Sequence, residues 1–292
     1  MMSIRCVAHG RMIGRSKLAA IAEREGFSIQ WTTAAKQMQS MAAAAIEQGC
    51  DRLLVAGGDG SLMEAAQCLL GSKTALAIIP GGTGNDFARS VKVPNQMEEA
   101  VEIALHGQIR GIDVGMARTL VNEQIDERIF LNIAEVGFGA GVVGRMNHFA
   151  RYAGKGLAYP IGILSGLLTL KKHAVDLEVD GKKMHVPALV NLVIANGRYF
   201  GRGLMPAPDA ELDDGLFDIL VIKNLGRIAI ARRFPELKTG PPANDPDMST
   251  FRCRRLKITT PSLGTEADGE VLGSTAAEFE VLPKALQVVM TQ

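Results

Sequence analysis

The chain has 292 residues and a nearly balanced charge, with 32 Lys and Arg against 31 Asp and Glu. This balance argues against a nucleic-acid partner, and the length allows two domains, each with its own core. The four cysteines, Cys6, Cys50, Cys68 and Cys253, form no CxxC pair, which argues against a zinc ribbon and a disulfide framework. The longest apolar stretch, 157–170, is too short and too mixed to span a bilayer, and no run of signal-peptide length lies near the N-terminus. We therefore predict a soluble, cytoplasmic protein.

Strands and helices are predicted to alternate over the first 115 residues. Short apolar runs predict strands at residues 4–8, 28–32, 51–56 and 75–79. The segments between and after them predict helices at 17–26, 36–48, 61–70 and 98–106. Such alternation is typical of a mostly parallel sheet covered by helices on both faces. Sheets of this kind bind ligands beyond the carboxyl ends of their strands.

Two glycine-rich turns follow the third and fourth of these strands. Residues 57–61 read GGDGS, and residues 80–86 read PGGTGND. Glycine lets backbone N–H groups approach an anion closely, and a helix N-terminus favours negative charge, so the two turns would form a cradle for polyphosphate. Asp59 and Asp86 lie in these turns, and carboxylates beside phosphates usually mean a divalent metal between them. An ordinary strand-to-helix turn capped by Ser61 is the competing interpretation of the first turn.

The pattern changes after Gly111. Strands are predicted at 113–117, 128–136, 174–179, 188–196, 216–221 and 255–260. Helices are expected only at about 142–149, 160–172 and 227–234. The sequence thus predicts an α/β domain over residues 1–115 and a β-rich domain over 116–283, with the C-terminal segment 284–292 returning to the first domain.

Several motifs, taken together, resemble the catalytic domain of diacylglycerol kinases. That family includes bacterial lipid kinases and sphingosine and ceramide kinases, and it is distantly related to NAD kinases. The two glycine turns are followed, in family order, by IDVG at 112–115, FLNIAEVGFGA at 130–140, NGRYFGRGLMPAPDAELDDGLFD at 196–218 and DGE at 268–270. The resemblance implies a parallel-sheet α/β nucleotide-binding domain and a β-sandwich-like acceptor-binding domain, with the active site in the cleft between them. It also implies ATP-dependent phosphorylation of a hydroxyl, commonly on a lipid, with Mg²⁺.

The resemblance assigns nucleotide-binding roles to residues of the first domain. They are Thr32, Gly57, Gly58, Asp59, Gly60, Ser61, Glu64, Gly82, Thr83, Asn85, Asp86 and Asp113. The family usually has threonine where Ser61 stands, so a hydroxyl is kept. Asp86 and Asp113 match aspartates of a network near the metal. Thr33 lies one residue from Thr32, which leaves that assignment open by one position.

Two carboxylates of the second domain are the catalytic candidates. A hydroxyl that accepts a phosphoryl group needs a carboxylate within hydrogen-bond reach to take its proton. The family position of the DGE motif implies that Asp268 is the general base and Glu270 its supporting partner. By itself DGE is common in solvated turns, so the assignment depends on the resemblance.

The segment ELDDGL at 211–216 is implied to hold a structural Mg²⁺. On the family pattern Asp214 supplies a carboxylate, and Glu211 and Leu216 supply carbonyl oxygens. Asp213 would join a water-linked network of aspartates. A polar turn between strands is the competing interpretation.

The chain departs from the family pattern at two places. Ala8 and His9 stand where the family has Asn-Pro, so the nucleotide contacts of the loop at 8–17 stay open. Gly139 stands where many relatives carry aspartate, which leaves open a change in the cleft or in the acceptor. The segment GFGAGVVG at 137–144 imitates a dinucleotide-binding fingerprint, but no acidic residue ends a following strand at the required distance. A dehydrogenase is therefore disfavoured.

The leading prediction is an ATP-dependent kinase that phosphorylates a hydroxyl of a lipid such as diacylglycerol. The alternatives are a kinase of another lipid (a sphingoid base, ceramide or phosphatidylglycerol), a kinase of a soluble hydroxyl compound, and a non-catalytic nucleotide- or lipid-binding regulator. A lipid acceptor implies peripheral contact with the inner membrane face. Basic residues that could face anionic headgroups are Arg252, Arg254, Arg255 and Lys257, although a solvated strand face is the competing interpretation. Assembly as a homodimer stays open.

Overall fold

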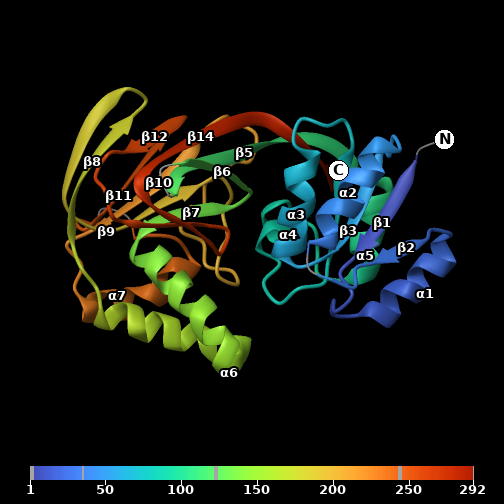
Figure 1. Cartoon of the computed structure of the whole chain (residues 1–292), viewed down its shortest axis with the longest axis horizontal. Helices are drawn as coiled ribbons and strands as arrows, with labels where there is room; N and C mark the ends of the chain where they lie inside the picture. Colours follow the sequence, from blue (N-terminus) through green and yellow to red (C-terminus); the bar gives the residue numbers. More distant parts are fainter. Residues whose placement is uncertain (1–2, 35, 122–123, 243–244, 292) are drawn as a thin grey trace. The chain divides into compact units, whose positions relative to one another are not determined.

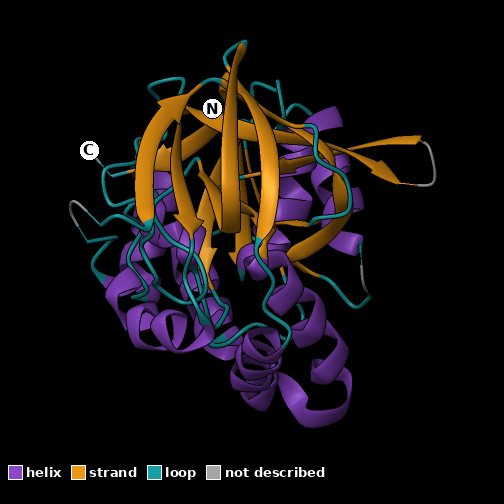
Figure 2. Ribbon diagram, turned by 90° about the vertical axis from the view of Figure 1, so that its left-hand side faces the viewer, coloured by secondary structure: helices purple, strands orange, loops and turns teal. Residues whose placement is uncertain are grey.

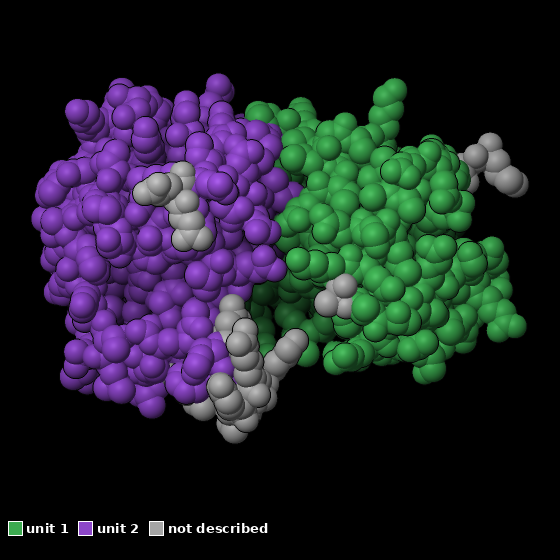
Figure 3. Space-filling view, in the orientation of Figure 1, with its two compact units in different colours: residues 1–114, 201–203, 283–292 green, residues 115–200, 204–282 purple. Residues whose placement is uncertain are grey.

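The computed structural model describes residues 3–34, 36–121, 124–242 and 245–291, with the backbone alone at residues 147, 150–161 and 163. The chain divides into two compact units, coloured separately in Figure 3. Unit 1 comprises residues 1–114, 201–203 and 283–292, and unit 2 comprises 115–200 and 204–282. The short segment 201–203, which no sequence pattern had linked to the first domain, belongs to unit 1.

Unit 1 is built from alternating strands and helices (Figure 1). Its strands are β1 (Ile4–Ala8), β2 (Ile29–Trp31), β3 (Arg52–Gly57) and β4 (Ala75–Pro80). Its helices are α1 (Arg15–Glu25), α2 (Gln37–Glu47), α3 (Asp59–Leu69), α4 (Asp86–Ser90) and α5 (Met97–His106). β1 pairs in parallel with β2 and β3, and β3 pairs in parallel with β4. Every residue of β3 and β4 is buried, as expected for strands covered on both faces.

Unit 2 is an antiparallel structure with a long helix. Its strands are β6 (Gln124–Phe130), β7 (Ile133–Gly137), β8 (His173–Val179), β9 (Lys182–Ala195), β10 (Phe217–Lys223), β11 (Met248–Cys253), β12 (Arg255–Ile258) and β13 (Gly264–Ala267). Its helices are α6 (Phe138–Leu168), α7 (Arg227–Arg233) and the 3₁₀ helix η1 (Phe234–Lys238). Two long strands, β5 (Gln108–Val121) and β14 (Glu270–Met290), begin in one unit and end in the other. Figure 2 shows the β5–β6 hairpin, whose tip at 122–123 is outside the described residues.

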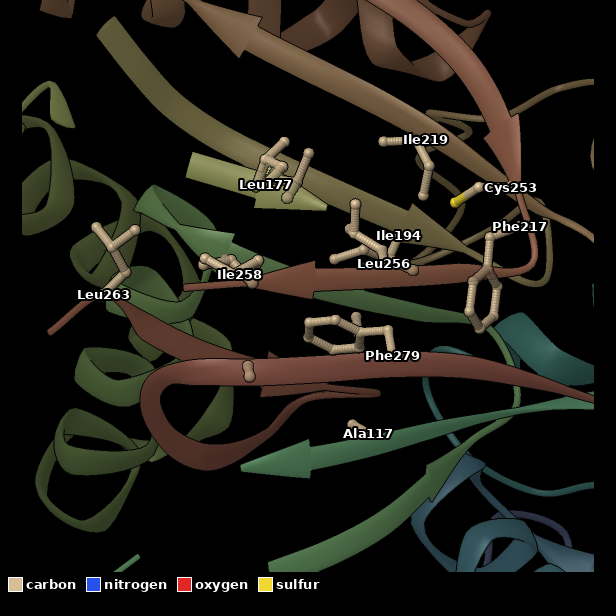
Figure 4. Packing of buried hydrophobic residues seen from close by; sticks show 14 of the residues in the cluster. Ala117, Leu177, Ile194, Phe217, Ile219, Cys253, Leu256, Ile258, Leu263 and Phe279 are labelled. Carbon is tan, nitrogen blue, oxygen red and sulfur yellow. The ribbon is translucent and has the colours of Figure 1, made fainter. Parts of the chain in front are cut away.

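The core of unit 2 is organised around three phenylalanine rings. The Phe130 ring stacks on the Phe217 ring at a centroid distance of 5.5 Å, and the Phe279 ring meets the Phe130 ring edge-on at 6.4 Å. Figure 4 shows Phe217 and Phe279 with Ile194 and Leu256 in the same cluster. Because β6, β10 and β14 each supply one ring, this contact ties together strands that are far apart in the sequence.

The predicted order of an α/β nucleotide-binding-like domain followed by a β-rich domain is confirmed. Among the described strands, parallel pairs are β1–β2, β1–β3, β3–β4 and the contact of β4 with the end of β14. The antiparallel pairs are β5–β6, β7–β9, β7–β13, β8–β9, β8–β12, β9–β10, β10–β11, β12–β14 and β13–β14. The β-rich domain contains strands that the sequence analysis did not predict, namely β11, β13 and the first half of β14.

One predicted strand and one predicted pair of helices differ from the structure. The strand expected at 128–136 is two strands, β6 and β7, because the backbone N–H groups of residues 131–133 donate to Asp268 instead of to a neighbouring strand. The helices expected at 142–149 and 160–172 are the two arms of α6, which doubles back on itself (Figure 1). A Cβ on Gly162 would lie 2.6 Å from the Met146 side chain, although 16 residues of straight helix would separate the two by about 24 Å.

Candidate functional site

The two glycine turns of unit 1 lie against each other, backbone to backbone. The Gly81 N–H donates to the Gly57 carbonyl at 2.8 Å, at the point where β3 and β4 both end. A Cβ on Gly82 would lie 2.5 Å from the Cα of Gly58, a distance that real side chains do not allow. Glycine at 58 and 82 is therefore what permits the two turns to approach so closely.

The first turn leads directly into helix α3. Gly58 is extended, Asp59 is the first helical residue, and the Ser61 N–H donates to the Gly58 carbonyl at 2.9 Å. Gly60 is exposed, and a side chain there would meet only open space. The start of this 11-residue helix thus presents backbone N–H groups and a positive dipole end at an accessible position.

Asparagine and aspartate side chains fix the second turn. Asn85 has a left-handed backbone (φ 55°), and its Oδ1 accepts the Gly82 N–H at 3.0 Å. The Gly82 N–H, one of the predicted phosphate donors, is therefore used within the turn. Asp59 reaches across from the first turn, where its Oδ1 accepts the Phe87 N–H at 3.1 Å. Thr83 remains exposed between these contacts.

Asp86 is the buried carboxylate of this site. Its Oδ1 pairs with Arg89 at 2.6 Å, and its Oδ2 accepts the Arg202 N–H at 2.8 Å, which explains why segment 201–203 belongs to unit 1. Burial is the main cause that raises the pKa of Asp86, and the nearby negative charge of Asp59 adds to it. The Oδ2 atoms of Asp59 and Asp86 both flank Gly84, so the structure brings these two predicted residues together.

The other predicted residues of unit 1 have separate surroundings. Asp113 is buried on β5, where its Oδ1 accepts the Lys284 N–H at 2.8 Å. Thr32 is buried just after β2, and its Oγ1 accepts the Gly10 N–H at 3.1 Å, which places it against the loop at 8–17. The neighbouring Thr33 instead bonds to Gln37 at the start of α2. Of the two threonines, the one in contact with the loop that follows β1 is Thr32.

Glu64 lies on α3 and is half-buried. A hollow of about 390 Å³ also lies in unit 1, lined by residues that include Trp31 and Met41, but by none of the residues predicted to bind nucleotide. This hollow is therefore separate from the predicted nucleotide-binding residues.

In unit 2, Asp268 occupies a tight turn between β13 and β14. Its backbone is left-handed (φ 45°), and its carboxylate accepts the N–H groups of Leu131 at 2.6 Å, Asn132 at 3.1 Å and Ile133 at 3.0 Å. These three donors stabilise the ionised carboxylate and fix its orientation. Glu270, two residues on, is exposed. The turn therefore carries one rigidly held and one open carboxylate.

A pair of buried glutamates behind this turn was missed by the sequence analysis. Glu135 on β7 lies opposite Glu266 on β13 in the antiparallel register, and both side chains are buried. The signal was available, because Glu135 interrupts an otherwise apolar strand and such residues are rarely buried without a partner. Gly139 makes room for this pair, since a Cβ there would lie 2.4 Å from the Glu135 carboxylate atoms.

The loop that was predicted to bind a structural metal ion instead forms an ion pair with Arg252. Asp214 forms an ion pair with Arg252, and its Oδ1 accepts the Leu216 N–H at 3.0 Å. Arg252 also lies 3.3 Å from Asp218, whose other oxygen is buried without a hydrogen-bond partner. Burial raises the pKa of Asp218.

Glu211 and Asp213 are exposed. In the part of the chain that the structure describes, no group of three or more His, Cys, Asp or Glu side chains is placed to hold a metal ion. Oxygen donors of the kind that Mg²⁺ prefers are present in this loop, but Arg252 already balances their charge.

Two family models match this chain almost end to end. Residues 10–117 match the diacylglycerol kinase catalytic domain. Residues 132–290, more than half of the chain, match the YegS C-terminal NAD kinase beta sandwich-like domain. The chain belongs to the diacylglycerol kinase catalytic-domain family. This membership confirms the resemblance inferred from the glycine turns and the downstream motifs.

Members of the diacylglycerol kinase family are similar to the chain over most of their length. A diacylglycerol kinase of Mycobacterium tuberculosis is 32% identical over 87% of this chain and 82% of the relative. A Shewanella frigidimarina protein named "Probable lipid kinase YegS-like" is 31% identical over 90% of this chain and 83% of the relative. A crystal structure of a putative diacylglycerol kinase from Bacillus anthracis has the same fold, with a TM-score of 0.77 at 23% identity over 99% of this chain and 97% of that one.

Among the described residues, no helix is both long enough and apolar enough to cross a membrane. Two of the basic residues expected at a membrane surface are engaged in ion pairs, Arg252 with Asp214 and Arg255 with Glu278. Arg254 and Lys257 are exposed on the same strands or beside them.

Proposed function

We propose that this protein is an ATP-dependent lipid kinase that transfers a phosphoryl group to a hydroxyl of diacylglycerol. The observation that carries the proposal is the pair of glycine turns at the ends of β3 and β4, locked together by the Gly81–Gly57 hydrogen bond. Relatives named diacylglycerol kinase, such as the one from Mycobacterium tuberculosis, favour diacylglycerol as the first acceptor to test.

Unit 1 would bind the nucleotide. Phosphoryl transfer depends on positioning and on charge neutralisation, and the start of α3 offers both through its N–H groups and its dipole. Because the Gly82 N–H is used by Asn85 and the Ser61 N–H by the Gly58 carbonyl, we assign the phosphate contacts to the Gly60 N–H, the Ser61 hydroxyl and Thr83. Asp59 and Asp86 flank one point beside Gly84 and would bind the Mg²⁺ that accompanies ATP as substrate.

Unit 2 would bind the acceptor. Asp268 is the proposed general base, with Glu270 orienting the acceptor hydroxyl. Three backbone donors hold the Asp268 carboxylate in one orientation, so an acceptor hydroxyl would meet it at a fixed place. Rigid placement of this carboxylate is what a positioned base requires.

A structural Mg²⁺ at the ELDDGL loop would be held by Asp214 and by the carbonyl groups of Glu211 and Leu216. Its binding would have to displace Arg252 from Asp214 or share that carboxylate with it. No step of the reaction depends on this ion.

The acceptor implies contact with a membrane surface. Arg254 and Lys257 are the exposed basic residues that we propose to face anionic headgroups. Sedimentation with anionic vesicles at low salt should carry the protein down, and high salt should release it. If the protein does not bind these vesicles at low salt, a soluble hydroxyl compound becomes the favoured acceptor.

The test of the function is transfer from γ-labelled ATP to a panel of acceptors: diacylglycerol, phosphatidylglycerol, a sphingoid base, ceramide and a soluble polyol. We expect label in the product of diacylglycerol. The Asp59→Ala variant should lose Mg-ATP affinity and turnover together. Full turnover and unchanged affinity in calorimetry would contradict the assignment of Asp59.

A further inference from the structure

The buried glutamates of unit 2 form a pair of neighbouring carboxyl groups. Glu135 and Glu266 lie directly opposite each other on β7 and β13, and their side chains are 4% and 3% exposed. Side chains paired in this way point to the same face of the sheet, so the two carboxyl groups lie next to each other. Two buried negative charges in this arrangement would repel each other strongly. One proton shared between the two carboxyl groups would remove that repulsion.

The pair is the centre of a longer chain of hydrogen bonds. At one end the Gly139 N–H, in the first turn of α6, donates to Asn191 Oδ1 at 2.9 Å, and Asn191 Nδ2 donates to Glu135 Oε1 at 2.6 Å. At the other end Glu266 Oε2 accepts the Gly269 N–H at 2.9 Å. Gly269 is the middle residue of the turn that carries the two catalytic candidates. The chain of bonds therefore runs from α6 to that turn.

The surroundings of the pair oppose its ionisation. The side chain of Asn191 and the backbone of Gly139, from β9 and α6, contribute no charge, and Asp268 is a further negative group acting on Glu266. Burial raises the pKa of Glu135. Burial and the adjacent Glu135 raise the pKa of Glu266 well above its usual value. Loss of the proton would place two negative charges side by side with a third nearby.

We propose that the Glu135–Glu266 pair is a positioning element for the Asp268–Glu270 turn and that it holds the turn in place only while it carries its proton. The role rests on the proposed function, in which this turn supplies the general base. The proton is not transferred in the reaction. It joins the two carboxyl groups, so that Glu266 can hold the Gly269 N–H and thereby the orientation of Asp268. Deprotonation would separate the carboxylates by repulsion and release the turn.

The Glu266→Gln variant tests the proposal, because an amide imitates the protonated carboxyl. Its N–H group can donate to Glu135 at any pH, and its carbonyl can accept from Gly269. We expect turnover near that of the wild type at neutral pH, and a decline at alkaline pH that is shifted upward or absent. Glu236→Gln, at an exposed glutamate of the same unit, should keep the wild-type pH profile.

Glu266→Ala removes the contact with Gly269. If it folds, kcat should fall on the order of 10²-fold, the usual cost of a misplaced catalytic group, with little change in KM for Mg-ATP. If the turnover of Glu266→Gln declines at alkaline pH in the same way as that of the wild type, the positioning role is wrong. A pair of glutamates that only fills the core would not determine the pH at which turnover declines.

Infrared spectroscopy gives a readout that needs no activity. The wild type at neutral pH should show the carbonyl band of a buried protonated carboxyl group, which Glu266→Gln should lack and Glu236→Gln should retain. Absence of this band from the wild type would overturn the proposal, whatever the enzyme does. If the band is present but no acceptor is phosphorylated, the proposed function fails, and the positioning role fails with it, while the shared proton stands.

Discussion

The close approach of the two glycine turns makes Gly82→Ala the sharpest structural test. The added Cβ would lie 2.5 Å from the Cα of Gly58 and 2.9 Å from Asn85 Oδ1. Neither neighbour is the free end of a flexible side chain, because one is backbone and the other accepts the residue 82 N–H. The turns must therefore move apart, at a cost of about 1–3 kcal/mol, as for other overpacked sites. Mg-ATP affinity should fall with stability, because both turns contribute to the proposed site.

Urea denaturation would measure the loss of stability, and calorimetric titration would measure the affinity for Mg-ATP. Gly60→Ala is the matched control for stability, since its Cβ would meet nothing within 4 Å and it lies in the first turn of α3. It should leave the free energy of unfolding unchanged or raise it by up to about 1 kcal/mol. A Gly82→Ala protein with wild-type stability and wild-type affinity for Mg-ATP would refute this account of the turns.

The remaining predictions concern the base, a buried arginine and pH. Asp268→Asn should lower turnover by about 10²–10⁴-fold and leave Mg-ATP binding nearly intact. Rapid-quench assays would measure the turnover of the folded variant, and calorimetry would measure its affinity for Mg-ATP. Turnover near that of the wild type would rule out Asp268 as the base. The guanidinium group of Arg52 donates hydrogen bonds to three carbonyl groups at the end of α5. The Arg52→Met substitution should therefore lower the free energy of unfolding by about 2–4 kcal/mol. A loss below about 1 kcal/mol in urea denaturation would contradict this role of Arg52. Because the pKa values of Glu135 and Glu266 are raised, their contribution to stability is complete below the ordinary glutamate pKa of about 4.3 and is lost as pH rises through their folded-state values. Melting temperatures measured against pH should decline less steeply above that point in Glu266→Gln than in the wild type, and parallel curves would argue against a raised pKa.

The sequence was most informative where local pattern determines structure. The strand-helix alternation and the glycine turns predicted β1 to β4, α1 to α3 and α5 to within a few residues, because each is defined by residues adjacent in the chain, whereas the short helix α4 was not predicted. Even there, the use of the Gly82 N–H by Asn85 was not visible, since it depends on the left-handed backbone at residue 85.

Long-range contacts account for most of what the sequence did not predict. The break between β6 and β7 is caused by Asp268, which lies more than 130 residues further along the chain. The partner of Glu135 is equally remote, so an acidic residue in an apolar strand signalled a buried polar site without naming Glu266. Similarly, Arg252 reaches Asp214 from β11, a strand that the sequence analysis did not predict.

The most direct test of the central claim is transfer of the γ-phosphoryl group of ATP to diacylglycerol presented in mixed micelles, with wild-type protein and Asp268→Asn assayed side by side. We predict labelled phosphatidic acid from the wild type in the presence of Mg²⁺, and product reduced by at least about 10²-fold in the variant. Absence of labelled lipid from the wild type with diacylglycerol and with every other lipid of the panel, while Mg-ATP still binds, would contradict the claim that this protein is a lipid kinase.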